Sequence, residues 1–455
     1  MREWIATAPP GAKLPSTRSL VSLHGASPVT VQKALRTLVS QGVVEARPGV
    51  GTFVRAARVV RPNDYGWQTA ALGSPNYRLQ LPIALQSTSN DVIALHSGYP
   101  ARELLPEGWF VQHSPERREP TPCSIGPSLP GFRNCSPGLP PNWVPQLLPG
   151  SLRRGRTTWL YFPAVRVGLR RPSVRWWGGA SVAHGIADLL GCDPAAAQAG
   201  VTVIPISSGA NGPDPEELSR AFEQTGARAF YAQPSFASPT GALWSPSLAD
   251  KVLDTVRRHG AFLIEDSSAL DFGITADPSP IAARDDSGHV VYLRALTKSV
   301  SPSVRVAGLI ARGPAYERIL ADTQADSMYV SGMLQAVALD VVTQPAWRTH
   351  LRRLRHQLEA RRDLLVSSLR EHAPDAHLDA VPQGGLNLWL RLPDTTNLER
   401  VVQDCRSAGV IVGAGDDWFP AEPTGKFLRL NYAGPNPGEF PDAARIIGRA
   451  ITQHM

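Results

Sequence analysis

The strongest constraint on the fold lies in residues 16–54, where helix-capping residues precede two runs of apolar residues at helical spacing. Ser16 and Ser27 are the expected N-caps, and Pro28 occupies the favoured first position of the second helix. Gly25 permits a tight turn between the two helices. The apolar faces are formed by Leu20, Val21, Leu23, Val31, Ala34, Leu35 and Leu38. This pattern predicts two packed helices joined by a sharp turn.

A β-hairpin is predicted directly after the second helix. Val43–Glu45 and Thr52–Val54 are short segments that can pair across the turn Arg-Pro-Gly-Val-Gly. Two helices followed by such a hairpin form a winged helix-turn-helix, whose second helix enters the major groove of DNA. The polar face of that helix and the wing offer candidates for DNA contact: Thr30, Gln32, Lys33, Arg36 and Arg47. For any one of these side chains alone, a solvated surface is the competing interpretation.

The positive charge of the chain is concentrated in two segments. Residues 1–60 hold eight Lys and Arg against two Glu, and residues 106–180 hold ten Arg against three Glu, in a chain of net charge +7. Only the first of these segments also has a DNA-binding pattern. We therefore expect residues 1–60 to contact the phosphate backbone.

The motifs LPSTR, SPVTVQKAL, QGVVE and RPGVGTFV give residues 1–55 a close resemblance to the GntR-type winged helix. The resemblance implies that Arg18, Ser27, Thr30 and Gln32 approach DNA and that Gly49 lets the wing backbone come close. Many relatives carry an arginine where this chain has Pro28. A two-pronged guanine contact is therefore lost, and base reading is expected to depend on Gln32, Lys33 and the wing.

At 455 residues the chain is too long for one ordinary domain. We expect the winged helix at 1–55, a linker at 56–88 and a second domain at 89–455. No run of 18 apolar residues and no signal-peptide core is present. Four cysteines (Cys123, Cys135, Cys192 and Cys405) show neither a CxxC pair nor metal spacing. This usage predicts a protein of the reduced cytoplasm without bound metal.

The second domain reads as an α/β fold. Short apolar segments within 200–208, 227–235, 261–268, 289–297 and 306–313 alternate with helical stretches at 215–224, 248–260 and 347–372. Such alternation predicts a mainly parallel sheet covered by helices on both faces. Residues 375–455 are expected to form a smaller α+β subdomain.

Residues 106–180 do not fit this pattern. They contain thirteen prolines and five of the eleven tryptophans, but neither lysine nor aspartate. Proline removes backbone donors and interrupts both helices and sheets. Two interpretations stay open: an irregular excursion, or a short stretch translated in a shifted reading frame.

Several residues in the second domain have the chemistry that pyridoxal phosphate requires. Lys298 follows a predicted strand, Arg305 lies seven residues later, and Asp266 ends another strand. The cofactor needs an amine for its aldehyde, a carboxylate for its ring nitrogen and a cation for its phosphate. Arg429, inside a late strand, has the fork that matches an amino-acid carboxylate. The competing interpretations are a surface lysine, a loop-capping aspartate and ordinary strand arginines.

With the winged helix, residues 1–105 and 195–455 resemble the MocR subgroup of GntR regulators, which fuse that domain to an aspartate-aminotransferase-like fold. The resemblance implies that Lys298 forms an aldimine with pyridoxal phosphate and that Asp266 meets the ring nitrogen. It also implies that Arg305 binds the phosphate and that Arg429 binds the carboxylate of an effector. It implies a homodimer, because the cofactor site of this fold is built at the subunit interface.

The chain departs from the aminotransferase pattern at three positions. Ser238 stands where an asparagine is usual, Ser268 stands at the position of an aromatic residue, and Ala295 lacks a hydroxyl that often binds phosphate. Ser238 and Ser268 are still expected to contact the cofactor. The substitutions favour a regulator that senses pyridoxal phosphate or an amino compound over a working aminotransferase. A regulator with a vestigial or damaged cofactor site is a further alternative.

Overall fold

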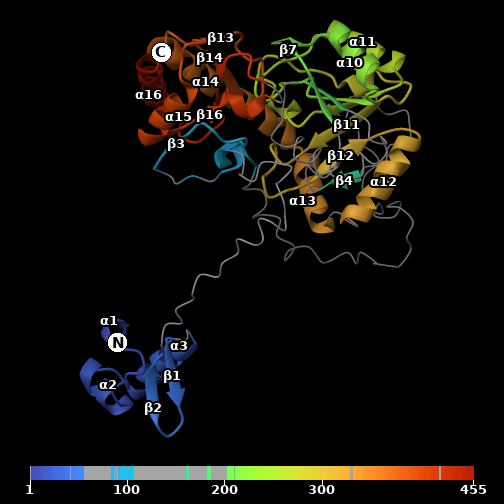
Figure 1. Cartoon of the computed structure of the whole chain (residues 1–455). Coiled ribbons are helices and arrows are strands. Elements are labelled where there is room, and N and C mark those ends of the chain that lie inside the picture. The colour runs from blue at the N-terminus through green and yellow to red at the C-terminus, as the bar shows by residue number, and fades with distance from the viewer. Residues whose placement is uncertain are drawn as a thin grey trace. The chain divides into compact units, whose positions relative to one another are not determined.

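The computed structural model describes residues 2–40, 43–55, 83–86, 88, 91–106, 160–162, 182–185, 202–209, 211–327, 331–419 and 422–455. The chain divides into two compact units, Met1–Ser74 and Pro75–Met455 (Figure 1). Most of the predicted linker and of the unusual window 106–180 lies outside the described residues, so neither interpretation of that window is tested. Ile83–Leu85, in the last part of the predicted linker, forms a short 3-10 helix, and the Ala84 carbonyl accepts from the Gly98 amide.

The first unit has the predicted order of elements. Helices α1 (Arg2–Thr7), α2 (Thr17–His24) and α3 (Pro28–Ser40) precede the antiparallel strands β1 (Val44–Arg47) and β2 (Gly51–Val54). The Ser16 hydroxyl accepts from the Ser19 amide and the Ser27 hydroxyl from the Thr30 amide, both at 3.2 Å, which confirms the two N-caps. Gly25 ends α2 in the left-handed conformation, with φ at 58°. The helix-turn-helix is therefore fixed locally by residues visible in the sequence.

The core of this unit is small. Ile5, Leu14, Leu38, Val44 and Val54 are buried together. Residues that precede α2 also join the hairpin, because the Leu14 amide donates to the Thr52 carbonyl and the Val54 amide to the Ala12 carbonyl. This extra edge was not predicted from the sequence.

Leu23 was predicted to be on the apolar face of α2, and this prediction is wrong. The side chain is 71% exposed, whereas Leu20, one turn earlier, is buried. The helix ends at His24, so Leu23 belongs to a last turn that extends past the core of the unit.

The larger unit contains a seven-stranded sheet in the order β4-β12-β11-β10-β9-β5-β6. Neighbours among β11, β10, β9, β5 and β6 are parallel, whereas β12 is antiparallel to both β11 and β4. The strands are β4 (Leu160–Phe162), β5 (Val182–Gly185), β6 (Val203–Ile206), β9 (Ala229–Ala232), β10 (Phe262–Asp266), β11 (Val290–Ala295) and β12 (Ala307–Ile310). This confirms the predicted α/β fold with a mainly parallel sheet. Strand β4 comes from the unusual window.

Helices cover the sheet on both faces. Helices α10 (Pro215–Thr225) and α11 (Pro246–Arg258) pack over Phe230, Leu263 and Tyr292. Helix α12 (Pro314–Ser327) packs on the opposite side over Tyr231 and Ile264. Because side chains alternate along a strand, Asp266 shares the face of Ile264 and Tyr231, while Glu265 belongs to the other face. The short strands β7 (Ser208–Gly209) and β8 (Gly212–Pro213) form a separate hairpin.

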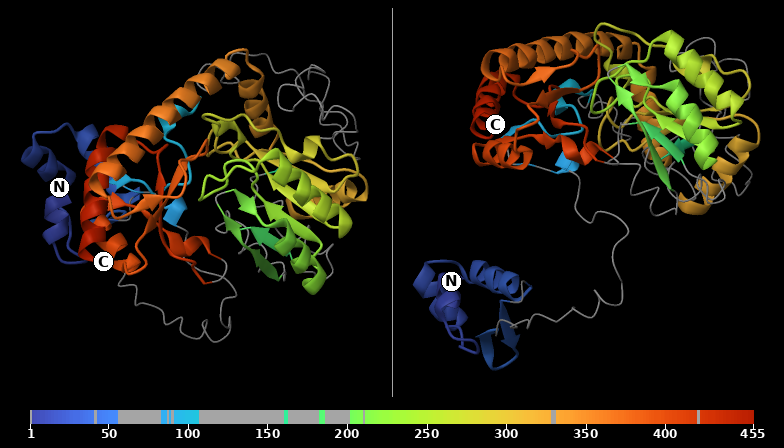
Figure 2. Two further views of the ribbon diagram at one scale, coloured as in Figure 1. Left: turned by 90° about the horizontal axis from the view of Figure 1, so that it is seen from above. Right: turned by 45° about the horizontal axis from the view of Figure 1, so that its top comes forward.

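The smaller subdomain is built on a four-stranded sheet in the order β13-β14-β17-β16. Its strands are β13 (His377–Leu378), β14 (Asn387–Leu392), β16 (Gly413–Ala414) and β17 (Lys426–Asn431), and β15 (Val410–Ile411) pairs with the distant β3 (Ile93–Ala94). The associated helices are α14 (Trp347–His372), α15 (Leu398–Ser407) and α16 (Phe440–Gln453). Helix α13 (Gly332–Thr343) instead packs against Leu296, Val300 and Val304 of the segment that follows β11. The long helix α14 runs beside α16 (Figure 2). The predicted smaller α+β part is confirmed, and it also recruits α14 and β3.

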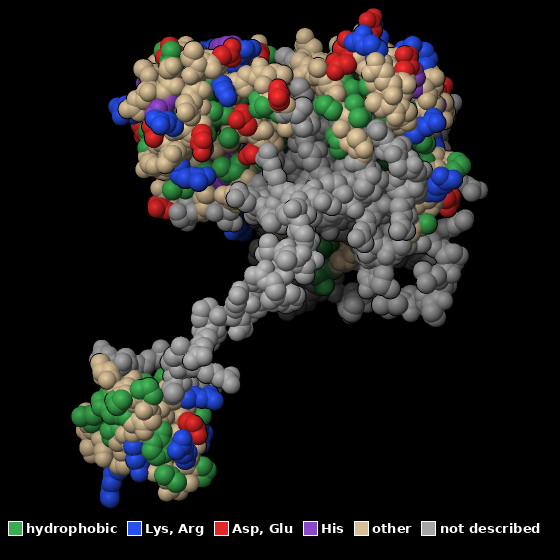
Figure 3. Space-filling model, viewed as in Figure 1, with side chains coloured by type: hydrophobic (Ala, Val, Ile, Leu, Met, Phe, Trp, Pro, Cys, Tyr) green, Lys and Arg blue, Asp and Glu red, His purple; other side chains and the backbone are tan. Residues whose placement is uncertain are grey.

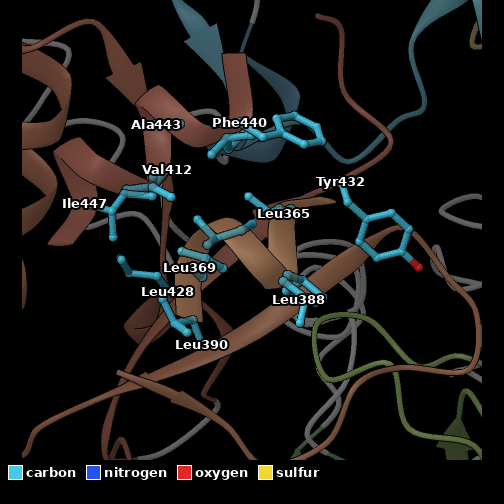
Figure 4. Packing of buried hydrophobic residues seen from close by; sticks show 14 of the residues in the cluster. Leu365, Leu369, Leu388, Leu390, Val412, Leu428, Tyr432, Phe440, Ala443 and Ile447 are labelled. Atoms are coloured by element: carbon cyan, nitrogen blue, oxygen red, sulfur yellow. The ribbon is translucent and has the colours of Figure 1, made fainter. Parts of the chain in front are cut away.

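The core of this subdomain joins α14, α16 and the sheet. Figure 4 shows Leu365 and Leu369 of α14 facing Leu388, Leu428 and Ile447. Burying each such side chain contributes about 1.5–3 kcal/mol.

None of the helices in the described part of the chain is long and apolar enough to cross a membrane.

Candidate functional site

The candidate DNA contacts are all exposed on the first unit, at Arg18, Ser27, Thr30, Gln32, Lys33, Arg36, Arg47 and Gly49. Figure 3 shows several of the unit's Lys and Arg side chains on the face in view. The hydroxyls of Ser27 and Thr30 lie 2.9 Å apart, so both are engaged in capping α3. The charged and amide side chains of Gln32, Lys33 and Arg36 therefore remain the more available contacts.

The wing presents an exposed arginine beside an aromatic ring. Arg47 donates to Glu45 at 3.3 Å, and its guanidinium lies 4.9 Å from the centre of the Phe53 ring. Both charges are exposed, and exposed ion pairs are weak enough for a phosphate to replace the carboxylate. Gly49 has φ at 75°, which places the turn of the hairpin in the left-handed region. The geometry is compatible with the predicted approach of the wing to DNA.

One exposed residue of α3 was missed. Val29, in the first turn of the helix, is 76% exposed next to Thr30. An apolar side chain at this position can contact the methyl group of a thymine. From the sequence, DNA contact was predicted only for the polar side chains of this helix, and Val29 was assigned neither to the apolar face nor to the exposed face.

In the second unit, Asp266 ends β10 and is 1% exposed. The hydroxyl of Tyr231 donates to its Oδ2 at 2.6 Å, and the Gln233 amide donates to the same oxygen at 3.1 Å. The Ser268 amide and hydroxyl both donate to Oδ1, the amide at 2.9 Å. The predicted partners Asp266 and Ser268 therefore lie together.

Gln233 links this carboxylate to the turn that contains Ser238. The Ser238 amide donates to the Gln233 side-chain oxygen at 2.9 Å. The structure thus brings Ser238, Ser268 and Asp266 into one buried network, although Ser238 joins it through its backbone. Tyr231 and Gln233 were missed, and their only signal in the sequence is that residues two apart on a strand share a face.

Lys298 and Arg305 occupy the loop between β11 and β12. The loop is closed by the Leu296 amide donating to the Val306 carbonyl at 3.0 Å and by the Thr297 hydroxyl donating to the Val304 carbonyl at 3.3 Å. Both cations are half-buried, and within the described part of the chain neither makes a hydrogen bond or ion pair. A half-buried amine and guanidinium without such partners are suited to a ligand.

The loop also carries a buried hydroxyl. The Ser299 hydroxyl, next to Lys298, has no hydrogen-bond partner in the described structure. Buried polar groups are almost always hydrogen-bonded. Ala295, the position where the hydroxyl is missing, is buried at the end of β11. Because β10 and β11 are parallel neighbours, their carboxyl ends lie at the same edge of the sheet. Asp266, at the end of β10, and the loop after β11 therefore lie at that edge.

Arg429, predicted to bind an effector carboxylate, lies in β17 of the smaller subdomain and is 2% exposed. Its two terminal nitrogens donate to the His96 carbonyl at 2.9 Å and the Ser97 carbonyl at 3.1 Å. Its guanidinium also lies 4.8 Å from the centre of the Trp418 ring. The two hydrogen bonds hold the 96–97 segment, and none of these three contacts joins Arg429 to Asp266.

The neighbouring carboxyl group, Glu265, serves the opposite face of the sheet. Its oxygens accept from the amides of Ile281 at 3.0 Å and Ala282 at 2.8 Å. Complete burial raises the pKa of Glu265 to about 7. Its contacts are structural, which leaves Asp266, on the other face of the sheet, as the candidate ligand carboxylate of β10.

Two protein families match the chain. Residues 1–54 match the family of bacterial regulatory proteins called gntR, and residues 192–447 match aminotransferase class I and II. The second match covers more than half of the chain. An aminotransferase class I and II domain implies pyridoxal phosphate as the cofactor.

The residues described above fit that cofactor. Lys298 would hold its aldehyde, Arg305 and the Ser299 hydroxyl would hold its phosphate, and Asp266 would hold its ring nitrogen. When bound, the cofactor supplies an electron sink for reactions of amino compounds.

Two relatives match nearly the whole chain. The uncharacterized HTH-type transcriptional regulator YdfD of Bacillus subtilis is 25% identical, and the match covers 95% of this chain and 89% of that protein. The uncharacterized HTH-type transcriptional regulator YjiR of Escherichia coli is 26% identical over 98% of this chain and 95% of its own length.

Among solved structures, the multiple substrate aminotransferase of Thermococcus profundus superposes with a TM-score of 0.69 at 19% identity, covering 84% of this chain and 98% of that chain. This likeness shows the fold of the larger unit. The chain therefore belongs to the aminotransferase class I and II family and carries a GntR-family winged helix-turn-helix at its N-terminus, the domain arrangement of the MocR subgroup.

Proposed function

We propose that this transcription regulator binds pyridoxal phosphate at Lys298 and changes its DNA binding when the cofactor, or an amino compound that reacts with it, occupies the site. The observation that supports this proposal most is the half-buried Lys298, which lacks a hydrogen bond or ion pair in the described structure. The exposed polar and basic side chains of α3 offer the DNA-binding surface of the same chain.

The contacts of Arg429 support sensing over turnover in this proposal. Arg429, the proposed clamp for an amino-acid carboxylate, already donates to two backbone carbonyls and is buried. An aminotransferase needs that clamp for each amino-acid substrate, whereas a sensor of pyridoxal phosphate itself does not. Lys298 is also compatible with a second candidate function, that of a working aminotransferase. Sustained formation of a keto acid from amino-acid donors would favour the enzyme.

The regulator is proposed to act as a homodimer in the cytoplasm. A dimer presents two recognition helices to half-sites about 10 base pairs apart or a multiple of that spacing. Effector binding then needs only to alter the spacing or orientation of the two DNA-binding units, provided that the effector prefers one arrangement.

The first experiment is an absorption titration of the full chain with pyridoxal phosphate, beside the Lys298→Ala variant. We expect the visible band of the cofactor to shift on binding to the wild type but not to the variant. Lys251→Ala, a change at another lysine of the same unit, is the control and should behave as wild type. Equal spectra for wild type and Lys298→Ala would exclude Lys298 as the attachment site.

A further inference from the structure

The carboxylate of Asp266 is fully engaged by the protein itself. Oδ2 accepts from the Tyr231 hydroxyl at 2.6 Å and from the Gln233 amide at 3.1 Å. Oδ1 accepts from the amide and the hydroxyl of Ser268. An ionised carboxylate offers about four acceptor positions. In this structure, four protein donors therefore occupy all of them.

The two donors on Oδ2 are held firmly. Tyr231 is 2% exposed and lies within β9, directly beside β10, where it is the Cα partner of Ile264. Gln233 is also buried, and its oxygen accepts from the Ser238 amide at 2.9 Å. Gln233 is thus fixed at both ends of its amide group. Neither donor can leave Oδ2 without losing a hydrogen bond to a charged group, which is among the stronger hydrogen bonds in proteins.

A protonated pyridine nitrogen needs one of the same acceptor positions. We propose that Tyr231 and Gln233 hold Asp266 in a closed state and that pyridoxal phosphate must displace one of them from Oδ2. The two residues are positioning residues that weaken cofactor binding. This inference rests on the proposed cofactor site, and it assigns to Tyr231 and Gln233 the control of its occupancy.

Tyr231 provides the cleaner test of the two. Tyr231→Phe removes one donor and keeps the ring that packs on the sheet. Loss of the Gln233 amide would also leave the Ser238 amide without its acceptor, and buried amides without acceptors destabilise a fold. Gln233→Met, which removes the donors and keeps most of the side-chain volume, is therefore the second variant rather than the first.

The test measures the dissociation constant of pyridoxamine phosphate by equilibrium dialysis against the full chain. This probe has the ring nitrogen and the phosphate but lacks the aldehyde, so its binding does not depend on a bond to Lys298. We expect Tyr231→Phe to tighten binding by about tenfold or more, the amount set by one hydrogen bond to a charged group. Gln233→Met is expected to change affinity in the same direction.

Tyr432→Phe is the matched control. Tyr432 is as deeply buried as Tyr231, and its hydroxyl has no hydrogen-bond partner in the described structure. Its removal should leave the affinity for pyridoxamine phosphate unchanged. Near-ultraviolet circular dichroism of each variant checks that the larger unit keeps its packing.

Unchanged or weaker binding by folded Tyr231→Phe would overturn the proposal, because the hydroxyl would then not compete with the ring. Absence of binding by both wild type and Tyr231→Phe would overturn it as well. These outcomes are separate from the regulatory function. If the cofactor binds but leaves the affinity for DNA unaltered, the proposed sensing role fails. The ratio of the dissociation constants of pyridoxamine phosphate for wild type and Tyr231→Phe still decides this inference.

Discussion

At the scale of single residues, two adjacent carboxyl groups have opposite roles. Glu265 and Asp266 point to opposite faces of the sheet because side chains alternate along β10. Glu265 accepts from backbone amides within the core next to α11, whereas Asp266 accepts from side chains at the edge that also carries the Lys298 loop. Position along one strand thus separates a structural carboxyl group from a candidate binding group.

The raised pKa of Glu265 makes the stability of the larger unit depend on pH. Because its pKa rises from 4.5 to about 7 on folding, the protonated form is favoured in the folded state. Its contribution is complete below pH 4.5 and is lost as pH rises to about 7, by up to roughly 3 kcal/mol. We expect the midpoint of urea unfolding to fall between pH 5 and pH 7.5.

Glu265→Gln provides the comparison for this pH dependence. The variant cannot titrate at this position, so its unfolding midpoint should fall less over the same interval, even if its stability is lower throughout. Glu216→Gln, at an exposed glutamate of α10, should retain the wild-type slope. A Glu265→Gln slope equal to that of the wild type would show that another group titrates.

Arg429 is expected to contribute to stability as well as to any ligand contact. Arg429→Leu removes two hydrogen bonds to backbone carbonyls and the packing over Trp418. We expect a loss of about 2 kcal/mol or more in the free energy of unfolding. Arg391→Leu, on the neighbouring strand with a weak exposed ion pair, should cost less than about 1 kcal/mol. Equal effects of the two changes would contradict the structural role.

At the scale of elements, the agreement between sequence and structure depends on how local the signal is. Helix α14 was predicted with its exact bounds, and the caps of α2 and α3 were also correct, because each rests on a few consecutive residues. The pairing of residues 12–14 with β2 was missed because it joins distant segments without a motif. The same limit applies to the contact between Tyr231 and Asp266.

Recognition by α3 can be separated into charge and shape. Lys33→Ala should weaken binding to all duplexes similarly and lower the slope of log affinity against log salt by about one. Val29→Ala should leave that slope unchanged and weaken only the preferred duplex, by about threefold to fivefold if a thymine methyl group is lost from contact. Fluorescence anisotropy at several salt concentrations, on a duplex selected from random DNA, measures both effects.

The matched control for these two variants is Val39→Ala, at an exposed valine near the other end of α3. It should alter neither the affinity nor the salt slope. A salt slope that falls equally with Val29→Ala and Lys33→Ala would contradict the assignment of phosphate contact to Lys33 alone. An unchanged affinity after Val29→Ala would exclude it from base contact.

At the scale of the whole molecule, the chain combines two compact units with separate cores. The exposed basic helix belongs to the first unit and the Lys298 loop to the second. Regulation therefore requires that binding in one unit changes the free energy of DNA binding by the other. By linkage, DNA must change the affinity for the cofactor by the same factor.

The most direct test of this account measures that coupling. The full chain is titrated into labelled duplex, selected from random DNA, with and without saturating pyridoxal phosphate, and Lys298→Ala is treated in parallel. The account predicts that the cofactor shifts the dissociation constant of the wild type by fivefold or more and leaves that of Lys298→Ala unchanged. The same affinity for the wild type in both conditions, with the cofactor demonstrably bound, would contradict it.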